Sequence, residues 1–269
     1  VVPAELALLP RIHTILVDLP PLVVPPQTVL QRVGGPEALL PYLRRYTKVK
    51  DNGKLDLAAM DLPRLPVEFE MGYQKRLLAH LASLILRHNK LRELHPSVGE
   101  CHTLTSIDVS YNLLTTLPAD ICVLSSLRTI DIRNNPIADL PVQLPKLSAL
   151  LNLLVGGNAF RFPPYAVVQR GLSHINAFLN KFCRLVDTDE LNLSNFGLER
   201  RHLVEEVYSH GGTTALDLSR NVIETLPAEI FTLTNLTRLN LSCNSLQELS
   251  PFVTRFLALR DLDLSHNAL

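Results

Sequence analysis

The sequence lacks several features that direct a chain toward a particular class of function. It has no tryptophan, and aromatic residues make up 6% of its 269 residues. Its 26 lysines and arginines are balanced by 26 aspartates and glutamates, so the formal net charge is zero at pH 7. Proteins that bind nucleic acids or anionic membranes through their overall charge carry a basic excess. We therefore expect neither nucleic acid nor a membrane surface as the partner.

Cysteines and long apolar runs are also scarce. The four cysteines are far apart and include no Cys-x-x-Cys pair: they are Cys101, Cys122, Cys183 and Cys243. Four cysteines in a chain of this length do not make a disulfide framework, which favours a reducing, cytoplasmic compartment. The most apolar stretch near the start, residues 15–24, is interrupted by a proline pair and an aspartate. It can neither span a bilayer nor form the core of a signal peptide, so we expect no membrane insertion.

What the sequence does contain is a repeat. The string Leu-x-x-Leu-x-Leu-x-x-Asn-x-Leu, with Ile or Phe replacing the last leucine in two copies, recurs at residues 81–91, 104–114, 127–137, 150–160, 236–246 and 259–269. Its asparagine slots follow one another every 23 residues within two groups: Asn89, Asn112, Asn135 and Asn158, then Asn221, Asn244 and Asn267. Such a strict interval predicts a stack of similar coils rather than separate helices.

The residues of each copy predict the course of one coil. Alternating apolar residues such as Ile107 and Val109 predict a short strand with one face in the core. The asparagine amide both donates and accepts, so a column of asparagines can satisfy backbone groups of adjacent coils as a ladder. Prolines in the pairs 117–118, 140–141 and 226–227 start the return segment. The pattern resembles that of leucine-rich repeats and predicts an α/β solenoid, a horseshoe or arc with a parallel concave sheet.

Two further copies depart from the pattern in the same way. Met60 and Phe196 stand in their asparagine slots, and each copy follows an insertion that opens with a proline pair and continues through a helical stretch, residues 39–46 and 175–182. The second set lies about 136 to 138 residues after the first. The same offset makes residues 12–17 a worn repeat. The chain therefore reads as a larger unit repeated almost twice.

From this organisation we predict one solenoid of about ten repeats over residues 1–269. Residues 1–54 form a degenerate first repeat and a helical insert, 55–162 regular repeats, 163–187 a second helical insert, and 188–269 regular repeats that stop mid-coil. In the second insert, five apolar residues share one helical face: Val168, Leu172, Ile175, Leu179 and Phe182. We expect this helix to pack on the solenoid through that stripe. Its opposite face remains an alternative binding surface, with Arg170, Asn176, Lys181 and Arg184.

The insertion resembles a more particular family. The 23-residue Leu-Pro form of the repeat resembles the intracellular Ras-group leucine-rich repeats. The segment 153–163, followed by Val-Val-Gln-Arg-Gly at 167–171 and by Ile175-x-x-Phe178-Leu179, resembles the leucine-rich repeat-containing protein 40 group, in which such a segment also occurs twice. Ala159 departs from the usual proline, and residues 180–182 depart from a basic Tyr-Leu-Arg type of segment. The resemblance implies an intracellular interaction protein and no reaction.

The predicted concave face carries the candidate site. Five of the ten strand positions between core apolar residues are aspartates, in the series Leu16, Asp56, Ile85, Asp108, Asp131, Leu154, Asn192, Asp217, Asn240 and Asp263. We predict a partner-binding face made by Arg87, Asp108, Tyr111, Asp131, Arg133, Asp217, Arg220, Arg238 and Asp263. The alternative is that the Asp-x-Ser pattern is satisfied locally, by Ser110, Ser219 or Ser265.

Catalytic motifs are not found in the sequence. It contains no GxxxxGK[ST] loop, no HExxH and no GxSxG. The nearest approach to a metal site is the group His88, His95, Cys101 and His102, whose members fall in different phases of the repeat and so point to different surfaces. Cys243 has no identifiable base beside it. We therefore predict no enzyme activity, no metal and no cofactor.

The sequence favours a non-catalytic protein–protein interaction scaffold or adaptor, a subunit of a larger intracellular assembly such as a cytoskeletal or axonemal complex. The alternative is the recognition arm of a GTPase, kinase, phosphatase or ubiquitin ligase whose catalytic domain lies outside this segment. Leu269 ends a repeat at its Asn-x-Leu corner, where an uncapped solenoid would expose its core. We expect further chain or a partner to cover that end.

Overall fold

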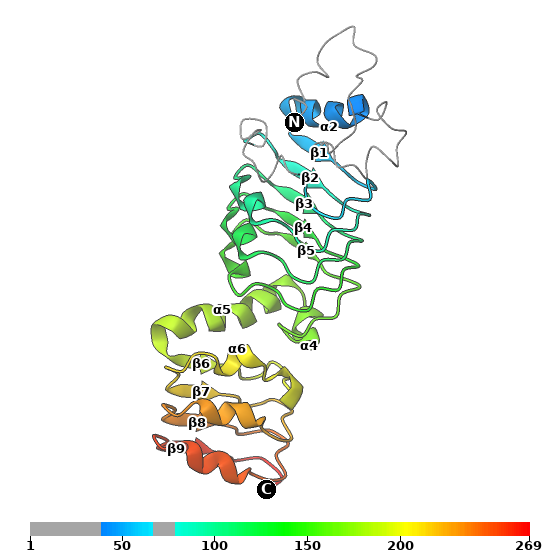
Figure 1. Ribbon diagram of the computed structural model, residues 1–269. Helices are drawn as coiled ribbons and strands as arrows, with labels where there is room; N and C mark the ends of the chain where they lie inside the picture. Colours follow the sequence, from blue (N-terminus) through cyan, green and yellow to red (C-terminus); the bar gives the residue numbers. More distant parts are fainter. Residues whose placement is uncertain (1–38, 67–78) are drawn as a thin grey trace. The chain divides into compact units, whose positions relative to one another are not determined.

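The computed structural model (Figure 1) describes residues 39–66 and 79–269 and divides the chain into two compact units, Val1–Ala159 (unit 1) and Phe160–Leu269 (unit 2). The described part of each unit begins with helical structure and continues as a stack of coils around a parallel sheet of its own. The worn repeat expected at residues 12–17, with its concave residue Leu16, lies outside the described residues. The grouping of all coils into one solenoid stays a prediction.

Unit 1 contains helix α2 (Leu39–Asn52) and a five-stranded sheet in sequence order. Its strands are β1 (Lys54–Asp56), β2 (Ser83–Ile85), β3 (Ser106–Asp108), β4 (Thr129–Asp131) and β5 (Asn152–Leu154). Short 3-10 helices follow three of the strands: η3 (Pro96–Glu100), η4 (Ala119–Val123) and η5 (Leu144–Lys146). Helix α2 was expected over residues 39–46 and extends six residues further.

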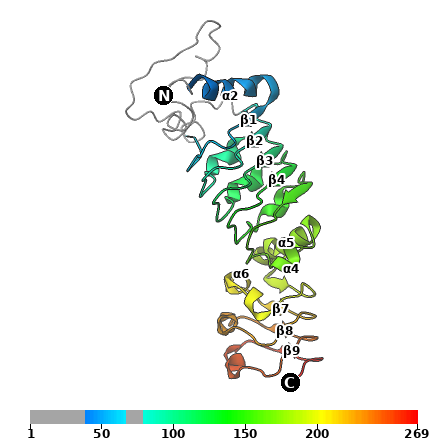
Figure 2. The same cartoon turned by 90° about the vertical axis from the view of Figure 1, so that its right-hand side faces the viewer.

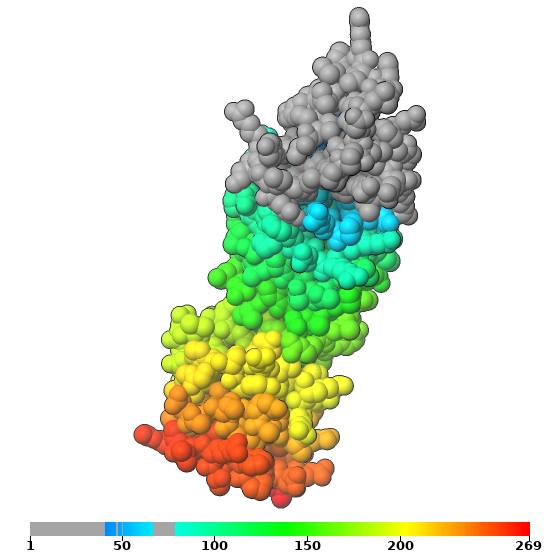
Figure 3. Space-filling view, viewed as in Figure 1, coloured from blue at the N-terminus to red at the C-terminus, as the bar shows by residue number. Residues whose placement is uncertain are grey.

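Unit 2 contains helices α4 (Tyr165–Val168) and α5 (Leu172–Thr188) and a four-stranded sheet, again in sequence order. Its strands are β6 (Glu190–Asn192), β7 (Ala215–Asp217), β8 (Arg238–Asn240) and β9 (Asp261–Asp263). The return segments carry η6 (Arg200–His202), α6 (Glu205–Tyr208), η7 (Ala228–Thr232) and η8 (Pro251–Arg255). Figure 2 shows these coils with strands on one side and short helices on the other, and the colours of Figure 3 follow the same coils in sequence order along the surface.

These observations confirm the predicted α/β fold of parallel strands and short helical return segments. The prolines of the repeat act as expected: Pro118 and Pro227 directly precede η4 and η7 in an extended conformation. The apolar residue three positions later, Ile121 or Ile230, is fully buried. A proline with fixed φ therefore turns each of these coils back over its core.

The asparagine ladder links each coil to the one before it. The Nδ2 group of Asn112 donates to the carbonyl oxygens of Leu86 and Val109, at 3.0 and 2.9 Å, and its Oδ1 accepts from the Leu91 N–H at 3.0 Å. The same three kinds of bond recur at Asn89, Asn135, Asn158, Asn221, Asn244 and Asn267. Each amide satisfies backbone groups that the turning chain would otherwise leave without partners.

The residue before each ladder asparagine has a left-handed backbone. In six coils this residue is not glycine: His88, Tyr111, Asn134, Arg220, Cys243 and His266 have φ between 54° and 56°. The corresponding residue of the fifth coil in unit 1 is Gly157, with φ 77°. A left-handed conformation costs roughly 1–2 kcal/mol for a residue with a Cβ. Most coils therefore contain one strained residue, whose conformation places the asparagine side chain in the core.

The two departing copies share a distinct first-coil structure. The Met60 and Leu62 N–H groups both donate to Oδ1 of Asn89, and the Phe196 and Leu198 N–H groups both donate to Oδ1 of Asn221. In the regular coils this oxygen accepts from a single backbone N–H between coils. The internal duplication seen in the sequence thus has a structural counterpart. In each unit, the first ladder asparagine makes an additional hydrogen bond to the preceding coil, which has no ladder asparagine of its own.

The second insert differs from its predicted form at its start. Val168 lies on α4, and the helix that carries the rest of the stripe begins at Leu172. Gly171 separates them with φ 88°, a conformation that L-residues rarely adopt, so the five residues do not share one continuous helix. Ile175, Leu179 and Phe182 are buried as expected, together with Phe178 and Leu185, which the prediction did not include. The opposite side is mixed: Arg170 and Arg184 are exposed, but Asn176 and Lys181 are half-buried.

Candidate functional site

Strand register brings the candidate residues into rows. In unit 1 the last residue of each strand pairs with its neighbour, in the order Asp56, Ile85, Asp108, Asp131 and Leu154. In unit 2 the same row contains Asn192, Asp217, Asn240 and Asp263. Adjacent strands lie about 4.8 Å apart, so these side chains are near neighbours along the sheet. We call this set of residues, which end the strands, the first row, and the set of residues that begin the strands the second row. The two rows together are the strand face.

Of the second row of the strand face, only Arg238 was part of the predicted site. It contains Lys54, Ser83, Ser106, Thr129 and Asn152 in unit 1 and Glu190, Ala215, Arg238 and Asp261 in unit 2. Side chains two residues apart on a strand point to the same side. The sequence carried this signal, since each of these residues lies two positions before a member of the predicted row.

All seven carboxylates and amides of the first row cap the turn that follows their own strand. Oδ1 of Asp108 accepts from the Ser110 N–H at 3.0 Å and from the Ser110 hydroxyl at 2.6 Å. Equivalent bonds to the backbone N–H two residues on are made by Asp56, Asp131, Asn192, Asp217, Asn240 and Asp263. The bonds from Ser265 also hold the pKa of Asp263 below its ordinary value. The local role of the Asp-x-Ser pattern, left open by the sequence, is thus present in the structure.

Asp131 and Arg133 form the most enclosed pair of the predicted set. Asp131 is 6% exposed. Its Oδ2 lies 2.7 Å from Nη2 of Arg133, and its Oδ1 accepts from the Nε of the same arginine at 3.0 Å. This contact raises the pKa of Arg133. Because each charge neutralises the other, this pair attracts a charged partner less strongly than an accessible, unpaired aspartate would.

The remaining members of the predicted set flank the row. The Tyr111 ring is 49% exposed and stacks on the His88 ring with centroids 4.4 Å apart. Arg87 and Arg220 are exposed beside their strands. Arg238 lies in the second row, where its Nη2 contacts Oε1 of Glu190 at 2.5 Å. Asp108 and Asp217 are half-buried, and Asp263 is exposed.

In unit 2 the strand face is hollowed into a groove of about 640 Å³, which we call the strand groove. It brings together three residues of the predicted site, Asp217, Arg238 and Asp263. Asn192 and Asn240, which share a row with the two aspartates, also line it. The side chains that the prediction missed are Glu190, Arg260 and Asp261. Four carboxylates thus face two arginines, so the strand groove is acidic.

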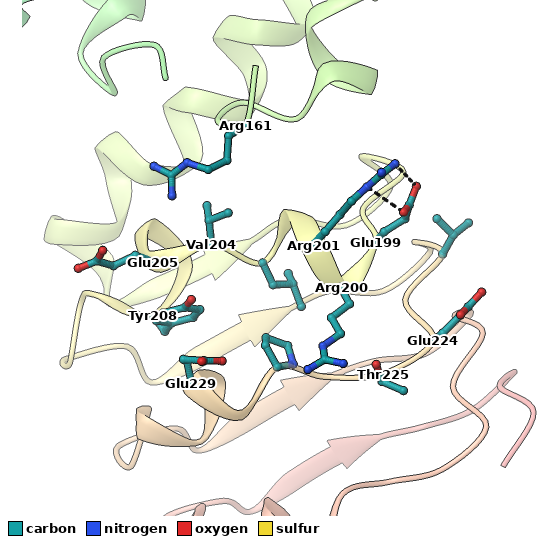
Figure 4. A pocket seen from close by; sticks show the side chains of 13 residues that line it. Arg161, Glu199, Arg200, Arg201, Val204, Glu205, Tyr208, Glu224, Thr225 and Glu229 are labelled. Atoms are coloured by element: carbon teal, nitrogen blue, oxygen red, sulfur yellow. Dashed lines mark hydrogen bonds and ion pairs between the residues drawn. The ribbon is translucent and has the colours of Figure 1, made fainter. Parts of the chain in front are cut away.

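A larger hollow lies on the side of unit 2 that carries the short helices. This helix-side recess has a volume of about 940 Å³, and residues that line it include Arg161, Arg200, Glu205, Tyr208, Val222 and Glu229 (Figure 4). Sequence reasoning did not find it. Its one signal is spacing: the coil from β6 to β7 advances 25 residues, whereas the next two advance 23. The additional length accommodates both η6 and α6.

The structure separates the residues considered for a metal site. His88 stacks on Tyr111, and His95 accepts from the Ser97 N–H at 3.2 Å. Cys101 is fully buried, and burial raises its pKa to about 11. Among the residues that the structure describes, no three histidine, cysteine, aspartate or glutamate side chains come together as metal ligands would. All four cysteines are described and none forms a disulfide; Cys243 is exposed.

None of the helices in residues 39–66 and 79–269 is long and apolar enough to cross a bilayer.

Comparison with known proteins gives the following matches. A leucine-rich repeat domain of APL1B is 19% identical, with 84% of this chain and 72% of that chain covered and a TM-score of 0.38. A leucine-rich repeat protein of Leptospira interrogans is 23% identical, with 82% and 57% covered and a TM-score of 0.35. Human trophoblast glycoprotein is 21% identical, with 81% and 78% covered and a TM-score of 0.35. Likenesses of this degree say nothing about function.

The chain spans a little over half, 57%, of the Leptospira protein. No curated protein sequence matches it. The leucine rich repeat family model matches residues 79–137 and 212–269, which contain strands of both sheets and six of the seven ladder asparagines. These two stretches are therefore leucine-rich repeats, and the fold around them is a leucine-rich repeat fold.

Proposed function

We propose that this chain is a non-catalytic scaffold or adaptor that binds a protein partner on its strand face. Leucine-rich repeat proteins generally use such extended surfaces for protein–protein interaction. The observation that supports the proposal here is the strand groove of unit 2, in which charged and amide side chains from all four strands stand in register. Its excess of carboxylates favours a basic partner segment.

The strand face of unit 1 supports a different contribution to binding. Its first row contains Ile85 between two aspartates and Leu154 at the end of the row, and Leu154 is 39% exposed. Beside the row, the exposed Tyr111 ring offers an apolar surface with a polar hydroxyl, which is common in protein interfaces. Together with Arg87 and Asp108 these residues make the unit 1 part of the binding surface that we propose, and Arg220 belongs to the unit 2 part.

The cellular setting is part of the same proposal. We infer a cytoplasmic protein and a subunit of a larger intracellular assembly, such as a cytoskeletal or axonemal complex. The resemblance of the insertion to the leucine-rich repeat-containing protein 40 group supports this inference. So do the four cysteines, none of which forms a disulfide.

The test removes charge from the strand groove without disturbing its turns. Asparagine naturally occupies the row at Asn192 and Asn240 and caps the turn as aspartate does. Asp217→Asn combined with Asp263→Asn should therefore keep the fold and lose the partners that the wild-type chain captures from cell extracts, measured by quantitative mass spectrometry. Glu248→Gln, an exposed change outside the groove, is the control. Full retention of every specific partner by the double variant would refute the proposal.

A further inference from the structure

The helix-side recess combines an apolar floor with charged walls. Leu203 and Val204 are buried at its base, and Val222 lines it with half of its surface exposed. Glu205, Tyr208 and Glu229 lie together at one end, and Arg200 extends between Glu229 and Thr225 (Figure 4). The recess therefore offers apolar contact and ionic contact within a single hollow.

Two ion pairs neutralise part of the wall. Nε of Arg201 lies 3.0 Å from Oε2 of Glu199, and Nη2 of Arg161 lies 3.4 Å from Oε1 of Glu206. With these four residues paired, the charges left on the lining are those of Arg200 and of three glutamates, Glu205, Glu224 and Glu229. Within the described residues, no hydrogen bond or ion pair engages the side chains of these four.

The negative charge is concentrated around the Tyr208 hydroxyl. Burial, and then the charges of Glu229, Glu205 and Glu206, raise the pKa of this hydroxyl, and the charge of Arg161 opposes them to a smaller extent. The second oxygen of Glu206, Oε2, is buried without a hydrogen-bond partner among the described residues. A positively charged group placed between Glu205 and Glu229 would relieve the repulsion among these carboxylates.

We propose that the helix-side recess is a second docking site, which takes a protein segment that places an apolar side chain on the floor and a lysine or arginine between Glu205 and Glu229. Charge complementarity carries this assignment, because the unpaired carboxylates outnumber the single unpaired arginine. The site lies apart from the strand groove, and their lining residues do not overlap. The chain would thus hold two partner segments through unit 2 at once.

The test measures binding of a short fluorescein-labelled peptide of alternating leucine and lysine to the full chain by fluorescence anisotropy at low salt. Matched peptides replace lysine with glutamate or leucine with serine. Glu205→Gln combined with Glu229→Gln should weaken binding of the leucine–lysine peptide by about tenfold, as expected from the loss of two partly exposed ion pairs. Glu248→Gln should leave it unchanged. Val222→Ser should weaken the leucine–lysine peptide but not the serine–lysine peptide.

A basic peptide could also bind the acidic strand groove, so Asp217→Asn with Asp263→Asn is measured in parallel. Glu205→Gln and Glu229→Gln are then added to the chain that already carries Asp217→Asn and Asp263→Asn. If they still weaken peptide binding about tenfold, the peptide binds at a separate site in the recess. If only the strand-groove variant weakens binding, or if the leucine–glutamate peptide binds as well as the leucine–lysine peptide, the recess is not this site. Neither result would affect the proposed role of the strand face.

Discussion

The two strand faces of this molecule have the same register and different chemistry. In unit 1 the second row is mostly uncharged, with serine, threonine and asparagine on β2 to β5, and the first row includes Ile85 and Leu154. In unit 2 the same positions carry Glu190, Arg238 and Asp261. The core leucines and ladder asparagines are alike in both units. The repeat thus determines where an outward side chain stands and leaves its identity open, so one chain can present a less charged and a more charged face.

The largest difference that we expect between the units is in thiol reactivity. Cys243 is exposed on unit 2, whereas Cys101 in unit 1 is fully buried with a pKa of about 11. Since the thiolate is the reacting form, iodoacetamide at pH 8 should modify Cys243 at least about a hundred times faster than Cys101. Peptide mapping by mass spectrometry over time measures both rates, and Cys243→Ser should remove the fast reaction. Comparable rates would mean that the coil around Cys101 opens readily.

The helices that precede the two sheets should also differ in their sensitivity to substitution. In unit 2, Phe178 packs against Phe162, Phe182 and Phe196 with ring centroids 5.0 to 5.6 Å apart. Phe178→Ala should cost about 3–5 kcal/mol of unfolding free energy because it opens a cavity in this cluster. Urea denaturation followed by circular dichroism measures the loss.

The matched change in unit 1 is Tyr46→Phe on α2. It removes the 2.9 Å hydrogen bond between the hydroxyls of Tyr42 and Tyr46. The expected cost is about 1 kcal/mol, the usual worth of one such bond. A Phe178→Ala variant no less stable than Tyr46→Phe would contradict the packing of α5 described above.

The ladder should show a smaller contrast between the units. Asn112→Ala leaves the buried Leu91 N–H without a partner and removes one of the two amide bonds to each of the Leu86 and Val109 carbonyls, which should cost about 3 kcal/mol. Asn244 makes the same bonds but is half-buried. Water can replace part of its role, so Asn244→Ala should cost about 1–2 kcal/mol. Equal losses in urea denaturation would mean that burial does not determine the strength of the ladder.

The smallest effect concerns the left-handed residue before each ladder asparagine. Cys243→Gly should stabilise the chain by about 0.5 kcal/mol, because glycine adopts φ 54° without strain but loses more entropy on folding. Tyr111→Gly should bring no gain, because it also removes the stacking on His88. Thermal unfolding of the two variants distinguishes these outcomes, and a destabilised Cys243→Gly would show that its side chain makes a contact that outweighs the strain.

Much of the fold could be predicted because it depends on local periodicity. The 23-residue interval, the alternation in each strand and the Leu-Pro pairs are visible in the sequence and correspond to β3, β4 and η4. The break between α4 and α5 could not be predicted from the apolar stripe, since it depends on the backbone conformation of Gly171. The candidate site was harder to predict. Whether Asp131 faces a partner or pairs with Arg133 depends on side-chain geometry that no spacing encodes.

The coil between β6 and β7 shows how such a stack can vary without losing order. Its two additional residues lie in the return segment, after β6 has paired and before β7 begins, so the strands remain in register. The length of this return segment can therefore change without altering the hydrogen bonds between the strands. A chain built from near-identical coils can acquire one asymmetric hollow by lengthening a single return segment, and a designer could move that hollow along the stack by choosing which coil to lengthen.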